Sequence, residues 1–259
     1  MNELMKLKLD ANELILCLSI AQARTVDIPM MAAACGYDAI YVDLEHSATS
    51  LETTSMLCAA AVGFGLITLV RVPSHDHQYM TRVIDTGAMG VIVPHVDTRE
   101  QAKHIVDTCK FPPIGHRSIS GPNPVTRYRP MTVTENVEFL NEQTILAAML
   151  ETPGAIEQAD AIASVPGLDM ILIGTHDLTA EMGILGQFRH ERFTKAMETA
   201  AAACQKHGVV MGIAGIKDLD LLGELVGLGV RFVSAGTDTG FFMEAAKAQA
   251  GRLRTVLVR

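Results

Sequence analysis

Two acidic residues stand directly after two consecutive strand-like runs in the middle of the sequence. The apolar run 145–150 stops at Glu151, and the run 170–173 leads through Gly174 to Asp177. Apolar residues at helical spacing lie between them, so the segment predicts a strand, a helix and a second, parallel strand. Parallel strands end at one edge of their sheet, which brings both carboxylates to the same rim. Such a pair suits a hard divalent cation, which prefers oxygen ligands.

The alternative is that both acids are ordinary ends of secondary structure, with Asp177 capping a following helix. Other reactive side chains at the ends of strand-like runs help to decide between the two interpretations. They are Asp43, Glu45, His46, Arg71 and His95. Considered alone, His46 would be interpreted as a structural histidine, and Arg71 would be interpreted as part of a surface ion pair. Together with the two acids they predict a group for acid/base catalysis, a guanidinium that binds an anion, and a metal site.

Eight strand-like runs alternate with helix-like segments, and these elements must position the reactive side chains. The expected strands are 14–19, 39–42, 67–70, 91–93, 145–150, 170–173, 209–213 and 232–235. The expected helices are 29–35, 51–62, 79–86, 100–109, 133–141, 155–165, 192–207, 219–227 and a last one from Phe242 onward. Eight such units in about 250 residues are typical of a (β/α)8 TIM barrel, in which chemistry lies at the carboxyl ends of the strands. We therefore predict one α/β domain over residues 1–259.

Composition agrees with a barrel and argues against several other classes of protein. The chain is 49% apolar without tryptophan, which suits buried parallel strands covered by helices. A net charge of −8 without basic clusters argues against nucleic-acid binding, and no apolar run reaches the ~20 residues of a membrane span. The five cysteines fit neither a disulfide framework nor a zinc site. Acids before the first apolar run are unlike a secretory signal, so we expect a cytoplasmic location.

Seven short segments along the chain share the pattern of a known family. They are YVDLEHS at 41–47, LVRVP at 69–73, DTGAMGVIVPHV at 85–96, GHRS at 115–118, MLETPGAI at 149–156, LIGTHDLTAEMG at 172–183 and VSAGTDTGFF near residue 240. In this order they resemble the HpcH/HpaI aldolases, a family of class II, metal-dependent pyruvate aldolases. The resemblance implies a barrel of the phosphoenolpyruvate/pyruvate type. It also implies reversible aldol cleavage and addition between pyruvate, or a related 2-oxo acid such as hydroxypyruvate, and an aldehyde.

The resemblance implies roles for individual residues. Glu151 and Asp177 match the ligands of a divalent cation, Mg²⁺, Mn²⁺ or Co²⁺. Arg71 matches the arginine beside the carboxylate and carbonyl of pyruvate. His46 matches the active-site histidine, and Asp85 matches its aspartate partner.

Further residues match positions around the substrate. Asp43 and Glu45 match acids that act through bound water. The backbone turn that helps to hold the substrate carboxylate, commonly Gly-Pro-Ala-Asp, corresponds here to Gly174, Thr175 and His176 followed by Asp177. Met149 stands where members often carry glutamine, which leaves the donor preference open. Ala214 takes a position facing the acceptor and indicates either a roomier pocket or simple packing at the rim.

The chemistry can also be derived from the side chains. A 2-oxo acid chelated through its keto and carboxylate oxygens has a removable C3 proton, because the cation acts as a Lewis acid and stabilises the enolate. Arg71 can anchor the same oxygens, and His46, tuned by Asp85, can move a proton. A Schiff base would need a lysine at the rim, and Lys217 lies in a polar turn past Gly215.

Two other functions remain as alternatives. One is a different reaction at the same metal site, such as a C–C or ester lyase reaction or decarboxylation of a 2-oxo acid. The other is a non-catalytic barrel kept for ligand binding or assembly. The complete set of His46, Arg71, Glu151 and Asp177 argues against the second alternative.

Residues 111–129 predict a long loop, because they are rich in Pro, Gly, Ser and Arg and show no period. Such a loop either meets another subunit or closes over the site of a monomer. The resembled family exchanges its last helix between subunits and forms trimers of dimers, so we expect a homohexamer. Phe241, Phe242 and Met243 would supply apolar contact at the start of that helix.

Overall fold

The structure is a computed structural model that describes residues 2–256, and it shows a closed barrel of eight parallel strands. The strands are β1 (Ile15–Ile20), β2 (Ala39–Asp43), β3 (Ile67–Arg71), β4 (Gly90–Val93), β5 (Ile145–Leu150), β6 (Met170–Gly174), β7 (Val210–Ala214) and β8 (Val230–Thr237). Each strand pairs with the next, and β8 pairs with β1. The predicted (β/α)8 barrel is therefore confirmed. The extent of the domain over 1–259 stays a prediction, since residues 1 and 257–259 lie outside the described part.

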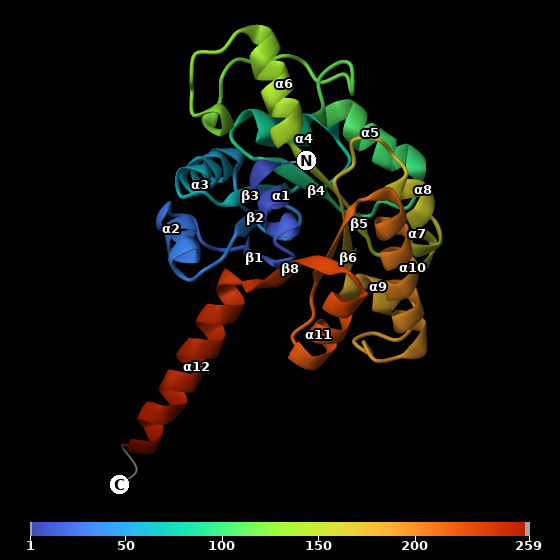
Figure 1. Ribbon diagram of the computed structural model, residues 1–259. Coiled ribbons are helices and arrows are strands. Elements are labelled where there is room, and N and C mark those ends of the chain that lie inside the picture. The colour runs from blue at the N-terminus through green and yellow to red at the C-terminus, as the bar shows by residue number, and fades with distance from the viewer. Residues whose placement is uncertain (1, 257–259) are drawn as a thin grey trace.

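Helices surround the barrel (Figure 1). They are α1 (Glu3–Asp10), α2 (Asp27–Ala34), α3 (Leu51–Gly63), α4 (His77–Asp85), α5 (Arg99–Cys109), α6 (Val133–Gln143), α7 (Pro153–Glu157), α8 (Ala159–Ala163), α9 (Thr175–Glu181), α10 (Glu191–His207), α11 (Leu219–Leu228) and α12 (Asp238–Val256). The helix predicted over 155–165 is two short helices, because the backbone leaves helical geometry at Gln158. Apolar spacing did not reveal this break, since Ile156 and Ile162 are buried on either side of it.

The alternation of side chains along each strand carries the reactive residues into the mouth of the barrel. Alternate strand residues fill the barrel interior, among them Ile67 and Leu69 on β3, while the intervening residues pack against the helices. Because the period of a strand is two, the next inward position on β3 is Arg71. The same count leads to Asp43 on β2 and to Glu151 just after β5. We call this carboxyl end of the barrel the rim.

The opposite, amino end of the barrel is closed by α1, a helix that was not predicted. Its Met5 is fully buried and packs with the interior side chains. Asp38, before β2, accepts a hydrogen bond from the backbone N–H of Leu16 at 2.9 Å. Asp169, before β6, accepts one from Leu146 at 3.0 Å. These carboxylates fix neighbouring strands at the end where no chemistry is expected.

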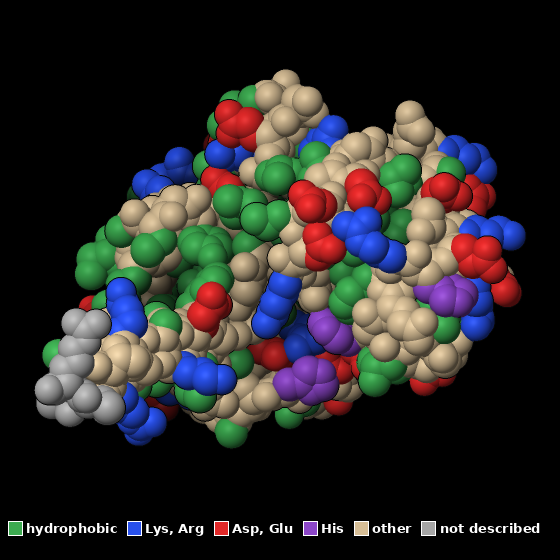
Figure 2. Space-filling view, turned by 90° about the horizontal axis from the view of Figure 1, so that it is seen from below, with side chains coloured by type: hydrophobic (Ala, Val, Ile, Leu, Met, Phe, Trp, Pro, Cys, Tyr) green, Lys and Arg blue, Asp and Glu red, His purple; other side chains and the backbone are tan. Residues whose placement is uncertain are grey.

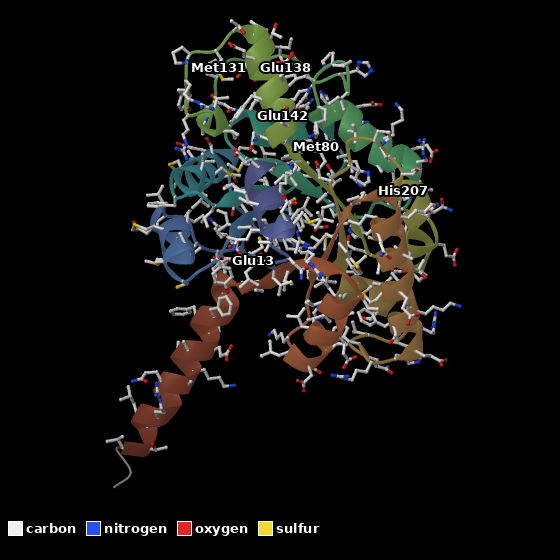
Figure 3. The ribbon with its side chains drawn as sticks, viewed as in Figure 1. Glu13, Met80, Met131, Glu138, Glu142 and His207 are labelled. Atoms are coloured by element: carbon white, nitrogen blue, oxygen red, sulfur yellow. The ribbon has the colours of Figure 1, made fainter. Side chains whose placement is uncertain are left out.

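The long loop at 111–129 lies at the amino end, where α5 finishes and β5 begins. Figure 3 shows Met131, Glu138 and Glu142, just beyond the loop and on α6, at the end of the molecule away from α12. The loop includes a short 3-10 helix at Pro124–Thr126, and its Phe111 is fully buried. The loop therefore contributes Phe111 and Val125 to a small hydrophobic core. A lid over the rim of its own chain is also excluded by this position.

The last helix, α12, projects from the barrel as an isolated rod (Figure 1). None of its described residues is buried, and Phe242 and Met243 expose 70% and 59% of their surfaces. A helix beside a barrel normally buries an apolar stripe. In the part of the chain that the structure describes, this helix therefore lacks a packing surface beyond its first turn, where Phe241 lies beside Tyr37. Within residues 2–256, no helix combines the length and apolar character needed to cross a membrane.

Candidate active site

Arg71 lies at the centre of one half of the rim. Its Nε and Nη2 atoms donate to Oδ1 and Oδ2 of Asp43 at 3.0 and 2.6 Å, because β2 and β3 pair with these residues in register. Its Nη1 atom lies 3.0 Å from Oε2 of Glu45. Arg71 exposes only 8% of its surface, so it is no surface ion pair. Its planar fork is held by a bidentate contact, as carboxylate recognition requires.

The two charges of this pair stabilise each other. Burial alone would raise the pKa of Asp43, but the hydrogen bonds and charge of Arg71 outweigh it and hold that pKa below its usual value. Burial likewise opposes the charge of Arg71, and the contact with Asp43 raises its pKa above the usual value. Arg71 is therefore a permanent cation at the rim. Asp43 and Glu45 contact it directly, while a role for these acids through bound water stays a prediction.

Glu151 occupies the other half of the rim and is 2% exposed. Its Oε2 atom accepts a hydrogen bond from the backbone N–H of His95 at 2.9 Å. The His95 ring spans two acids, with Nδ1 at 3.2 Å from Glu151 Oε2 and Nε2 at 3.2 Å from Glu45 Oε1. The sequence placed His95 after a strand without indicating this bridge. The bridge depends on a left-handed backbone at His95, with φ of 53°, which no spacing pattern reveals.

The end of β6 is built to receive Glu151. A Cβ atom at Gly174 would lie 2.6 Å from Glu151 Oε1, so only glycine leaves room for the carboxylate. Gly174 also precedes α9, and Asp177 stands exposed in the first turn of that helix. Asp177 is therefore not the N-terminal cap that the alternative interpretation proposed. The first turn nevertheless favours a negative charge there.

The cluster of carboxylates carries uncompensated negative charge. Burial raises the pKa of Glu151, and the negative charges of Glu45 and Asp177 raise it further. The hydrogen bond and the charge of His95 lower this pKa but do not outweigh the other effects. The buried Glu45 Oε2 accepts no well-aligned hydrogen bond, and its partner is the charge of Arg71, whose Nη1 lies 3.0 Å away. Within the described residues, no three His, Cys, Asp or Glu side chains form a ready metal cage. Two carboxylates with room for water and substrate oxygens are instead the set that Mg²⁺ uses, so the residues fit such a cation.

The remaining predicted residues at β6 and β7 lock these strand ends together. Thr175 is buried, and its hydroxyl donates to the carbonyl of Ala214 at 2.8 Å. His176 packs edge-on against Phe188, with ring centroids 5.4 Å apart. A Cβ at Gly215 would lie 2.5 Å from His176 Nδ1, so that turn must also be glycine. Ala214 is only half-buried, which leaves space beside it at the rim.

His46 stands at the open edge of the rim. Its side chain is 65% exposed, and its Nε2 atom lies 3.7 Å from Glu45 Oε2. Its backbone N–H donates to Asp43 Oδ1 at 3.3 Å. The imidazole is thus beside the acids and free to meet a ligand. Figure 2 views the molecule from the side on which α12 leaves it, and it shows histidine side chains beside a hollow with acidic and basic groups inside.

Asp85 does not join His46 within this chain, contrary to prediction. It is the last residue of α4, and its carboxylate accepts hydrogen bonds from Arg117 and from Ser120. Because α4 leads from the end of β3 back toward the start of β4, its last residue lies near the amino end of the barrel. His46 lies at the carboxyl end. The matched motif located Asp85 in the sequence but did not reveal this separation.

The arrangement combines a cationic fork, a carboxylate pair and an exposed imidazole around one mouth. Arg71 can hold a carboxylate, and Glu151 with Asp177 can hold a cation. His46 can exchange a proton with a ligand bound between them. These are the parts needed to bind a small oxo acid and to move charge within it.

Comparison with known proteins gives a consistent result. The model of the family described as HpcH/HpaI aldolase/citrate lyase matches residues 19–245. The chain is 39% identical over 233 residues to the 4-hydroxy-4-methyl-2-oxoglutarate aldolase of Hapsidospora irregularis, covering 88% of this chain and 86% of that protein. It is 34% identical to the 4-hydroxy-2-oxovalerate aldolase of Novosphingobium aromaticivorans, covering 85% of this chain and 83% of that protein. The crystal structure of an HpcH/HpaI aldolase from Desulfitobacterium hafniense superposes with a TM-score of 0.88 at 29% identity, covering 97% and 95% of the two chains.

The raised pKa of Glu151 predicts an effect of Glu151→Gln on stability. Glutamine keeps the acceptor for the N–H of His95 and removes a buried charge beside Glu45 and Asp177. Without metal, the variant should unfold at a higher temperature than the wild type, by about 2–4 °C per kcal/mol gained. A carboxyl group with a raised pKa costs stability as pH increases past its ordinary value of 4.5, so the difference should grow from pH 4.5 upward.

Calorimetry of both proteins with and without Mn²⁺ checks this prediction. The cation should raise the unfolding temperature of the wild type and leave that of Glu151→Gln nearly unchanged. Glu157→Gln, at an exposed position on α7, serves as the control and should behave as the wild type. A metal-free Glu151→Gln protein that is less stable than the wild type would contradict the prediction.

Proposed function

The chain belongs to the HpcH/HpaI aldolase/citrate lyase family, and we propose that it is a lyase that reversibly cleaves 4-hydroxy-2-oxo acids. The products are pyruvate, or a related 2-oxo acid such as hydroxypyruvate, and a second carbonyl compound. The main support is one juxtaposition: the buried fork of Arg71 shares the mouth of the barrel with the buried carboxylate of Glu151. A 2-oxo acid presents an anion and a polarisable carbonyl side by side, which matches these two partners.

Glu151 and Asp177 would hold a divalent cation such as Mg²⁺, Mn²⁺ or Co²⁺. When bound, the cation supplies Lewis-acid polarisation of the keto oxygen. The raised pKa of Glu151, to which the charges of Glu45 and Asp177 contribute, supports a cation at this position. The chain's own contribution is to hold the Glu151 carboxylate at the rim, where Gly174 leaves space for it and His95 contacts it from the side.

Arg71 would bind the carboxylate of the 2-oxo acid, with Asp43 fixing the plane of its fork. In the cleavage direction, His46 would accept the proton of the C4 hydroxyl. The C3–C4 bond then breaks, its electron pair passes to the 2-oxo acid half, and the C4 carbonyl compound leaves. C3 then takes up the proton that His46 accepted, directly or through water, which gives the 2-oxo acid and restores the imidazole. Thr175, His176 and Ala214 would line the same mouth.

The names of two relatives support the class of substrate. 4-Hydroxy-4-methyl-2-oxoglutarate and 4-hydroxy-2-oxovalerate are both 4-hydroxy-2-oxo acids. Cleavage between C3 and C4 gives an aldehyde when C4 carries a hydrogen, and a ketone when C4 carries two carbon substituents besides C3. The half-buried Ala214 at the end of β7 supports room for such a substituted acceptor.

We also propose that the protein is a cytoplasmic homohexamer, a trimer of dimers in which α12 packs on a neighbouring subunit. The exposed apolar side chains of α12 support this assembly, because they lack a packing surface within the described chain. Closed symmetric oligomers are the usual result of such self-association. The single domain over residues 1–259 is part of the same proposal.

The function is tested by an aldol assay with pyruvate or hydroxypyruvate as donor and a panel of aldehydes, with product analysis. We expect a 4-hydroxy-2-oxo acid to form, activity to be lost after EDTA treatment, and Mn²⁺ or Mg²⁺ to restore it. Full activity after exhaustive chelation would refute the metal-dependent mechanism. Release of CO₂ from the 2-oxo acid instead of a new C–C bond would favour decarboxylation at the same site.

Arg71→Lys tests the binding of the 2-oxo acid. A lysine keeps one positive charge but cannot make the bidentate contact with Asp43 or present a planar fork to the substrate. We expect kcat/KM to fall by about 10²-fold or more, the scale for losing one positioned donor. Arg189→Lys, at an exposed ion pair with Asp218 and Glu224, is the control and should retain full activity. Wild-type kinetics in Arg71→Lys would remove Arg71 from the mechanism.

Light scattering tests the assembly. The wild type should have a mass near six times that of the 27.9 kDa chain, and Phe242→Glu should shift it to smaller species by placing a charge in the apolar contact. Leu7→Glu, at an equally exposed position on α1, should leave the mass unchanged. A wild-type mass of one chain at micromolar concentration would rule the assembly out.

A further inference from the structure

The carboxylate of Asp238, the first residue of α12, binds the loop that follows β1. Its Oδ1 atom accepts a hydrogen bond from the backbone N–H of Ala21 at 3.1 Å. Its Oδ2 atom accepts from Gln22 at 2.9 Å and from Ala23 at 2.6 Å. Three consecutive N–H groups of a loop therefore end on one side chain from 215 or more residues away in sequence. These bonds hold the pKa of Asp238 below its usual value although burial opposes this.

Arg24, the last residue of the same loop, folds its side chain back onto the loop. Its Nη1 atom donates to the carbonyl oxygens of Ala21 and Ala23 at 3.1 and 3.2 Å. The N–H groups of the loop thus bind an acid while its carbonyl groups bind a base. The backbone hydrogen bonds of the loop are therefore satisfied by one distant carboxylate and by one side chain of the loop itself, which restricts its freedom.

The junction that carries Asp238 is itself rigid. Gly236 has a φ of 143°, and the ring of Phe241 packs so closely over it that a side chain could not be accommodated. Phe241 also lies beside Tyr37, with ring centroids 6.4 Å apart. Ser19 and Thr237 are partners in the pairing of β1 with β8. The loop after β1, the end of β8 and the start of α12 therefore form one unit.

The topology places this unit across the mouth from the cation site. In a closed barrel of eight strands β1 lies opposite β5, which leads to Glu151. Arg71 ends β3, and Glu151 and Asp177 follow β5 and β6; these three residues are the ones proposed to bind the 2-oxo acid and its cation. The C4 substituents of a substrate anchored there extend toward the other side of the mouth, which includes β8 and β1. The loop at 21–24 therefore stands where the acceptor half of the substrate would lie.

We propose that Asp238 is a positioning residue for the acceptor half of the active site, holding the loop at 21–24 against the rim from the base of α12. This inference rests on the proposed aldolase function. Under this proposal, binding of the aldehyde acceptor depends on Asp238, although Asp238 does not contact the substrate. It also links the geometry of the rim to the helix proposed to pack on a neighbouring subunit.

Asp238→Asn tests the proposal. In asparagine, an NH₂ group replaces one of the two carboxylate oxygens. This NH₂ group cannot accept a hydrogen bond from a loop N–H group, so the loop should become more mobile. With pyruvate as donor and glycolaldehyde as acceptor, KM for glycolaldehyde should rise about tenfold or more while kcat changes little, since displacements near 1 Å already cost large factors. KM for pyruvate should stay within about twofold. In the substrate-free protein, amide hydrogen exchange at residues 21–23 should become faster, as measured by mass spectrometry.

Asp38→Asn is the matched control, because Asp38 binds the backbone N–H of Leu16 at the other end of the same strand. It should affect stability but neither KM for glycolaldehyde nor exchange at residues 21–23. Unchanged acceptor KM or unchanged exchange in Asp238→Asn would overturn the proposal, as would an equal rise of acceptor KM in Asp38→Asn. Wild-type protein without aldol activity would instead refute the proposed function, and the exchange measurement distinguishes the two failures.

Discussion

The site depends on repulsion between carboxylates that the barrel forces together. The inward positions of β2 and β5 bring Asp43 and Glu151 to one mouth, and the connections that follow β2 and β6 add Glu45 and Asp177. Arg71 neutralises the first half by a bidentate contact, whereas Glu151 retains a raised pKa. Charges of one sign in a partly buried site favour a cation more strongly than they would in water. The fold thus leaves excess negative charge at Glu151 and Asp177 beside the cationic Arg71. A metal ion can bind to the two carboxylates, and the anionic oxo acid can bind to Arg71 and to that ion.

Individual residues fix the geometry of the rim around these charged groups. Gly174 is required because Glu151 occupies the space of a Cβ, and Gly215 because His176 does. His95 adopts a left-handed backbone so that both its N–H and its ring meet acids. Asp238 holds the opposite side of the mouth through three backbone bonds. A site held on strand ends and fixed loops keeps its geometry without substrate, as preorganised catalysis requires.

Much of this could be predicted from the sequence because strands and helices follow local apolar patterns. The eight strands lie within two residues of their expected bounds, and Arg71 and Glu151 lie at the rim as a barrel requires. The bridge by His95 could not be predicted, since it depends on one backbone angle. The separation of Asp85 from His46 and the break at Gln158 were also hidden. A motif records which residues occur, whereas contacts across the barrel depend on where each helix ends.

In the proposed mechanism, Glu151 and Asp177 hold a divalent cation beside Arg71. The most direct measurement is anomalous diffraction near the manganese edge from crystals grown with Mn²⁺ and pyruvate. We expect one strong anomalous peak within coordination distance of both carboxylates, about 2.0–2.6 Å for hard cations, with the carboxylate of pyruvate bound by Arg71. A peak that avoids Glu151 and Asp177, or ordered pyruvate at the rim without any anomalous peak, would contradict it.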